Sequence, residues 1–68
     1  MTIEEGRRHF GLSVEDLERL SVSGIDMLID SSVQLAKRTI SERTKEYCRK
    51  EIHALETLKE YVERRENA

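Results

Sequence analysis

The 68-residue sequence has no proline, only three glycines and a single cysteine. Scarce helix breakers, together with 38% charged residues, are typical of a helical protein with many surface ion pairs. The lone Cys48 excludes an internal disulfide and fits a reducing, cytosolic setting. The glycines are isolated, so they form no Gly-rich phosphate loop.

Long apolar runs are also absent, so no segment is expected to span a membrane. The first ten residues, MTIEEGRRHF, lack the apolar centre of a secretory signal, and we expect a cytoplasmic protein. A chain of 68 residues forms one domain and buries only about 60% of its unfolded surface. With no disulfide and no visible metal cluster, oligomerisation is the expected source of added stability.

Two short helices are predicted at the N-terminus. Thr2 and Glu5 have the spacing of a capping box, which predicts a helix from Ile3 to about Phe10, ended by Gly11 in the left-handed conformation. Ser13 is a good N-cap for the next helix, which should end within residues 21–24, SVSG.

The remaining chain carries two apolar stripes at helical spacing, separated by the polar run Ser41–Glu46. Glu, Arg and Lys in this run favour helix, which predicts one long helix from Ser31 or Ser32 to about Arg64. The alternative is a hairpin that turns near Ser41–Thr44, because Ser and Thr side chains can bond their own backbone. The expected fold class is therefore all-α, with two short N-terminal helices packed on a long C-terminal helix.

A continuous helix of about 50 Å would leave much of its apolar stripe uncovered by the short helices. A second copy in a helical homodimer or small oligomer is the simplest cover. The stripes place the expected interface for self-association or a partner at Val33, Ile40, Tyr47, Leu55, Leu58, Tyr61 and Val62.

Charge is unevenly distributed along the chain. The stretch Gly11–Asp30 has a net charge of −4, whereas Lys37–Lys50 has a net charge of +4, and the two blocks can attract each other within or between chains. The candidates for anion or nucleic-acid contact are the basic residues of the second block, Lys37, Arg38, Arg43, Lys45, Arg49 and Lys50.

Catalytic, cofactor and metal sites are not expected. Cys48 and His53 are five residues apart, which places them about 140° apart around a helix. No pair of histidines at helical ligand spacing and no Cys-x-x-Cys is present. We therefore expect no cofactor and no small-molecule substrate.

Two functions remain as hypotheses. The first is a non-enzymatic protein–protein interaction module, a small regulator, adaptor or inhibitor that docks helices on a larger protein. The alternative is a nucleic-acid-binding transcriptional regulator that uses the basic residues on a dimer. Residues 12–32 have the outline of a helix-turn-helix, but Asp26 and Asp30 would repel phosphates.

Overall fold

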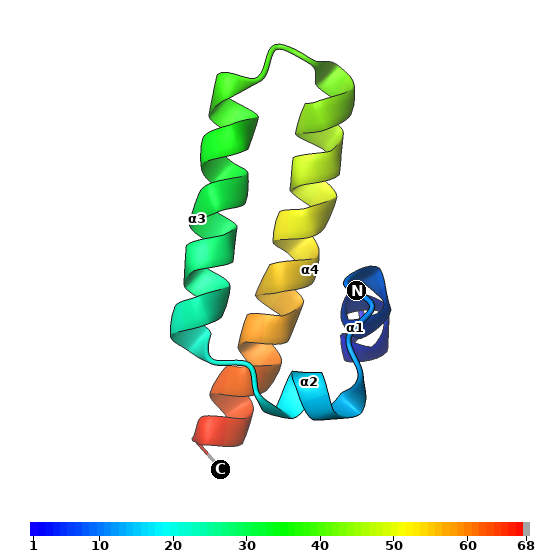
Figure 1. Ribbon diagram of the computed structural model, residues 1–68, viewed down its shortest axis with the longest axis vertical. Helices are drawn as coiled ribbons and strands as arrows, with labels where there is room; N and C mark the ends of the chain where they lie inside the picture. Colours follow the sequence, from blue (N-terminus) through cyan, green and yellow to red (C-terminus); the bar gives the residue numbers. More distant parts are fainter. Residues whose placement is uncertain (68) are drawn as a thin grey trace.

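The computed structural model describes residues 1–67 and shows an all-α chain, with no strand in that range. Four helices follow one another: α1 (Ile3–His9), α2 (Val14–Glu18), α3 (Val22–Arg38) and α4 (Glu42–Glu66). Helices α3 and α4 form an antiparallel hairpin that accounts for most of the length of a molecule measuring 41 × 20 × 16 Å (Figure 1). The all-α class predicted from composition is confirmed.

Both short helices begin at the predicted caps. The Thr2 hydroxyl accepts a hydrogen bond from the Glu5 amide at 3.2 Å, and the Glu5 carboxylate accepts one from the Thr2 amide at 3.2 Å. Ser13 and Asp16 make the same reciprocal pair at 3.1 and 3.2 Å. Gly11 has a φ of 65°, the left-handed conformation predicted after the first helix.

The predicted continuous helix through the polar run is wrong, because the chain reverses direction at Thr39–Ser41. Thr39 is extended, with ψ of 145°, and its hydroxyl accepts from the Ser41 amide at 3.2 Å. The Ser41 hydroxyl then accepts from the Thr44 amide at 3.3 Å and caps α4. These local side-chain bonds compete with helix continuation, which is the reason given for the alternative hairpin. The turn lies slightly earlier in the chain than the Ser41–Thr44 expected for that hairpin.

The predicted helix start at Ser31 or Ser32 is also wrong, because α3 runs without interruption from Val22 to Arg38. The Ser31 hydroxyl donates to the Met27 carbonyl of the preceding turn at 3.1 Å, so it does not cap a new helix. The cap of α3 is Ser21, whose side chain accepts from the Gly24 amide at 3.1 Å. The SVSG stretch therefore begins a helix, whereas the sequence predicted that it ends one.

The core lies where the two long helices meet the short ones. Its buried members come from α2, α3 and α4: Leu17, Ile25, Leu55, Leu58 and Val62. Because the chain folds back at residues 39–41, the apolar stripe of α4 is covered by α3 of the same chain. The need for a second chain, which the continuous helix would have created, is reduced accordingly.

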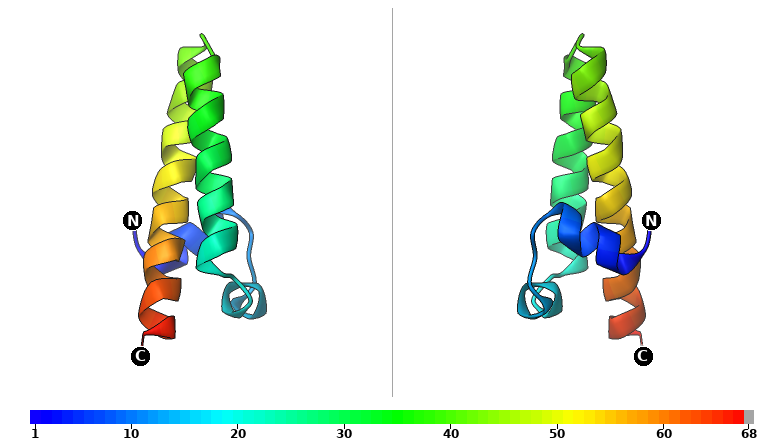
Figure 2. Two further views of the ribbon diagram at one scale, coloured as in Figure 1. Left: turned by 90° about the vertical axis from the view of Figure 1, so that its left-hand side faces the viewer. Right: turned by 90° about the vertical axis from the view of Figure 1, so that its right-hand side faces the viewer.

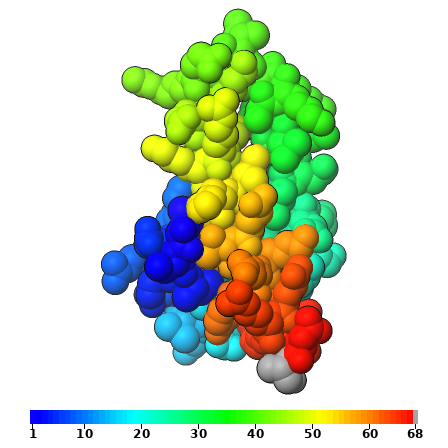
Figure 3. Space-filling model, turned by 180° about the vertical axis from the view of Figure 1, so that it is seen from behind, coloured from blue at the N-terminus to red at the C-terminus, as the bar shows by residue number. Residues whose placement is uncertain are grey.

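The short helices lie beside only one half of the hairpin. Helix α1 packs across the middle of α4, where Gly6 is buried next to Ala54 and Leu58 (Figure 3). Helix α2 projects from one side of the hairpin near its base (Figure 2). The half of the hairpin that ends at Thr39–Ser41, called here the tip, is therefore only two helices thick.

Candidate interaction groove

One face of α3 provides the first wall of a groove. Leu28, Ser31, Ser32 and Leu35 are spaced by three and four residues, so their side chains lie on one side of the helix. Ser32 is buried, whereas Leu28 and Leu35 remain 54% and 47% exposed. The wall therefore presents two leucines to solvent on either side of a pair of small polar residues.

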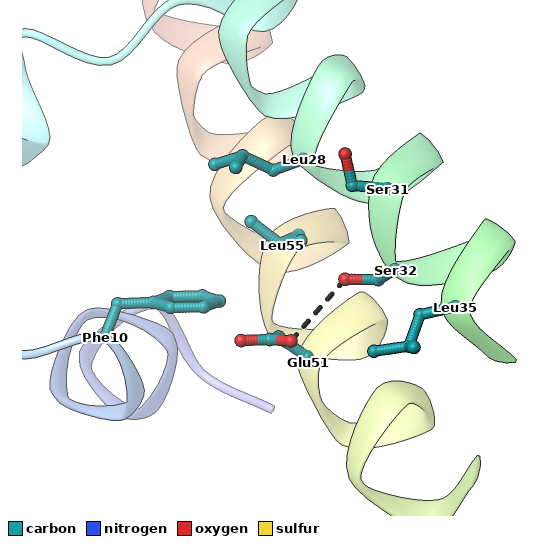
Figure 4. A pocket seen from close by; sticks show the side chains of 7 residues that line it. All are labelled: Phe10, Leu28, Ser31, Ser32, Leu35, Glu51 and Leu55. Carbon is teal, nitrogen blue, oxygen red and sulfur yellow. Dashed lines mark hydrogen bonds between the residues drawn. The ribbon is translucent and has the colours of Figure 1, made fainter. Parts of the chain in front are cut away.

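Helices α4 and α1 complete the groove. Leu55 and Glu51, one turn apart on α4, form its floor, and Phe10, the C-cap of α1, forms the opposite wall (Figure 4). The open space between these side chains is about 380 Å³. The lining is mainly apolar and includes one carboxylate, which is the composition of a binding surface with a few orienting polar groups.

The carboxylate of Glu51 is held from two sides. The Ser32 hydroxyl donates to Oε2 at 3.5 Å from α3, and the Tyr47 hydroxyl donates to Oε1 at 3.3 Å from the previous turn of α4. The negative charge of Glu51, followed by this hydrogen bond, raises the pKa of Tyr47 above its ordinary value. The phenol therefore stays protonated and remains a donor to the Glu51 carboxylate.

Basic residues follow this groove toward the tip. Arg38 is three residues beyond Leu35 on α3, and Arg43 is four residues before Tyr47 on α4, so both lie between the groove and the turn, although neither lines the groove. At the other end, the chain passes from Phe10 through Gly11 into α2, whose first turn is acidic. The groove thus lies between a basic tip and an acidic short helix.

The predicted interface residues are divided between the core and the surface. Leu55, Leu58 and Val62 are buried within the chain, with exposures of 3% or less. Val33 and Tyr61 are partly buried, and Tyr61 donates to Glu18 of α2 at 3.4 Å. Of the remaining two, Ile40 is in the turn and 96% exposed, and Tyr47 is at the groove and 55% exposed.

The predicted basic residues gather at the tip but do not share one face. Lys45 and Arg49 pair with glutamates of their own helix, Glu42 and Glu46, at 3.4 and 3.2 Å. Across residues 1–67 the other four have no ion-pair partner: Lys37, Arg38, Arg43 and Lys50.

The residues considered for thiol or metal chemistry are not brought together. Cys48 is fully buried between the long helices, and His53 is exposed on α4, where its Nε2 lies 3.4 Å from the amino group of Met1. His9 stacks edge-on against Phe10 at the end of α1. In the described residues, no three groups of metal-ligating type converge.

The groove-lining residues Phe10, Leu28, Ser32, Leu35 and Glu51 were absent from the sequence-based interface. One feature of the sequence could have indicated the groove. Leu35 lies off the centre of the apolar stripe of α3, so the residues that cover that stripe do not fully cover its side chain. The folding back of α4 supplies the second wall, and this could not be placed without the hairpin.

Comparison with protein-family models, curated proteins and solved structures finds no match to this chain. None of the helices described is both long enough and apolar enough to cross a membrane.

Proposed function

We propose that this chain is a non-enzymatic protein–protein interaction module of a single domain, acting in the cytoplasm. It would serve as a small regulator, adaptor or inhibitor that docks the α3–α4 hairpin on a larger protein. The observation that carries the proposal is the open groove between α1, α3 and α4, with Leu28 and Leu35 about half exposed on its rim.

An apolar rim of this kind favours docking of another polypeptide. Covering the exposed halves of Leu28 and Leu35 would contribute about 1 kcal/mol each, from the area removed from water. Phe10 and Leu55 add apolar surface deeper in the groove. The Glu51 carboxylate offers lone pairs beyond the bonds from Ser32 and Tyr47, and these can fix the register of a docked segment.

The same polar centre supports binding rather than chemistry. Ser32 is the buried hydroxyl of the groove, and it donates to a carboxylate at the long distance of 3.5 Å. A serine nucleophile needs a base that takes its proton, usually a histidine oriented by a third group. The lining residues of the groove include no histidine.

The test compares capture of proteins from the host lysate by tagged wild type and by L28Q/L35Q. Glutamine has similar helix propensity to leucine, so the double variant removes apolar surface while the helix is kept. M27Q is the matched control, because Met27 is 70% exposed on the same helix but does not line the groove. Circular dichroism melts verify that all three chains fold.

The proposal expects a nuclease-resistant partner that is retained by wild type and M27Q and reduced about tenfold or more with L28Q/L35Q. Capture that is equal for all three chains would show that the groove is not the docking surface. Loss of all captured material after nuclease treatment would favour the second candidate function.

That second candidate is a nucleic-acid-binding transcriptional regulator that uses the tip. It is favoured by four tip residues that have no ion-pair partner within residues 1–67 and so leave positive charge available to phosphates: Lys37, Arg38, Arg43 and Lys50. Binding through phosphates should weaken steeply between about 50 and 200 mM salt, whereas apolar docking should not. A salt titration of the captured complex therefore separates the two functions.

A further inference from the structure

We infer that the groove face is covered by a second copy of this chain, in an antiparallel, two-fold symmetric dimer. This inference rests on the proposed docking role of the groove and names the occupant of that same surface. A larger protein that docks there would then compete with the second copy.

The first argument is charge. The acidic block lies at the base of the molecule, on α2 and the first half of α3, and the basic block lies at the tip (Figure 1). Within residues 1–67, no ion pair joins the two blocks. In the acidic block, Asp26 pairs with Lys59 and Glu18 with Arg65, which leaves Glu15, Asp16 and Asp30 without an ion pair within residues 1–67. An antiparallel second copy places the basic tip of each chain against this acidic base of the other, so both ends attract. A parallel copy would set like charges together at both ends.

The second argument is symmetry along α3. The midpoint between Leu28 and Leu35 falls at Ser31 and Ser32, the two small residues of the groove wall. A two-fold axis through this midpoint sets Leu28 of one copy opposite Leu35 of the second copy, and the reverse. The small, exposed side chain of Ser31 at the axis lets the two α3 helices approach closely while the leucines pack on either side, and the buried Ser32 faces α4 of its own chain.

The third argument is shape and size. Helix α2 stands out from the hairpin at its base, which gives the molecule a step at one end (Figure 2). The chain enters α2 directly after Phe10 of the groove and Gly11. The thin tip of an antiparallel copy fits against that step. The two longest extents of the chain are 41 and 20 Å, so an antiparallel copy of equal length can lie along the whole of the groove face.

The test is sedimentation equilibrium of the purified, untagged chain up to about 1 mM, with three sets of variants. The first set is L28Q/L35Q with M27Q as its control. The second set reverses charge at only one end of the molecule, with R38E/R43E at the tip or E15K on α2. The third combines R38E/R43E with E15K in one chain. All three charged positions are exposed, and Glu15 makes no ion pair within residues 1–67.

The antiparallel dimer predicts that wild type and M27Q both dimerise. L28Q/L35Q should raise the dissociation constant about a thousandfold, because the two-fold arrangement covers both leucines of each copy. Reversing the tip alone should weaken the dimer about tenfold, and adding E15K should recover part of that loss, because opposite charges meet again. A chain that is monomeric at every concentration overturns the inference. A dimer that is insensitive to L28Q/L35Q, or to the charge reversals, overturns the assigned face or the antiparallel arrangement.

The two proposals fail separately. If the chain is monomeric but captures a protein through Leu28 and Leu35, only the second copy is wrong. If a groove-dependent dimer forms and the lysate yields no other protein, the larger partner is wrong and the dimer stands.

Discussion

Arg65, near the end of α4, donates a hydrogen bond of 2.8 Å to the main-chain oxygen of Leu20, 45 residues earlier in the sequence. Its second guanidinium nitrogen donates to the Leu17 carbonyl at 3.2 Å and lies 3.7 Å from the Glu18 carboxylate. Helix α2 has no basic residue in its own last turn. The arginine of α4 therefore ties the chain at and just after the end of α2 to the hairpin, adding a donor to the Leu17 carbonyl, which also accepts from the Leu20 amide at 3.3 Å.

Replacing Arg65 should release α2 from the hairpin. R65A removes a charged donor from two main-chain oxygens and should lower the free energy of unfolding by about 1–2 kcal/mol. R64A is the control, because Arg64 is exposed and, within residues 1–67, its one ion pair is with Glu60 of its own helix. Amide hydrogen exchange within α2 should accelerate in R65A and not in R64A, and equal exchange in both would contradict the role given to Arg65.

Gly6 should tolerate one methyl group but not a larger side chain. A Cβ at this position would lie 3.5 Å from the Ala54 carbonyl oxygen and 3.6 Å from a Leu58 methyl, which are ordinary contact distances. Because alanine also favours helix over glycine, G6A should stabilise the chain by up to about 1 kcal/mol. G6L should destabilise it by about 1–3 kcal/mol through overpacking. Urea unfolding measures both, and a destabilising G6A would show that α1 packs more tightly than described.

Acid should weaken the two N-terminal caps. The pKa of Glu5 is lowered mainly by the hydrogen bond from the Thr2 backbone amide, and the pKa of Asp16 by that from the Ser13 amide. A carboxyl whose folded pKa is below its unfolded value stabilises the fold fully above the unfolded pKa, near 4, and loses this contribution as pH falls through the folded pKa.

The free energy of unfolding should therefore fall as pH drops below about 4.5, and E5Q/D16N should show a smaller fall. Urea titrations from neutral pH to pH 2 measure both slopes. Parallel pH profiles for wild type and E5Q/D16N would contradict the role of these two carboxylates.

Substitutions of two isoleucines of the α3–α4 hairpin should differ strongly in their effect on the free energy of unfolding. Ile40 is 96% exposed in the turn, so I40N should change the free energy of unfolding by less than about 0.5 kcal/mol. Ile25 is 1% exposed in the core, so I25A should cost about 2–5 kcal/mol. Thermal melts suffice for the comparison. A large loss in I40N would mean that a contact outside this monomer covers Ile40, as the sequence-based interface assumed.

Local chemistry in the sequence predicted the short helices, because a cap depends on residues three apart such as Thr2 and Glu5. It did not place the turn, because Thr39 and Ser41 are surrounded by strong helix formers and either outcome satisfies local preference. The hairpin is favoured because it packs the apolar stripes of α3 and α4 against each other. The contact from Arg65 to Leu20 spans most of the chain and has no local signature.

The groove, too, could be predicted only in the part that depends on local sequence. The exposed Leu35 is visible in the sequence as an apolar residue off its stripe, but Phe10 and Glu51 reach it only through tertiary packing. The charge blocks could be counted in advance, whereas their separation at opposite ends of the hairpin required the fold.

The most direct test of the groove is to measure solvent exposure of its methyl groups with a dissolved paramagnetic agent. Methyl signals of Leu28, Leu35 and Met27 are recorded at rising protein concentration and in host lysate. The account predicts that the two leucines become protected while Met27 remains exposed to the agent. Equal relaxation of all three residues under every condition would mean that nothing docks in the groove.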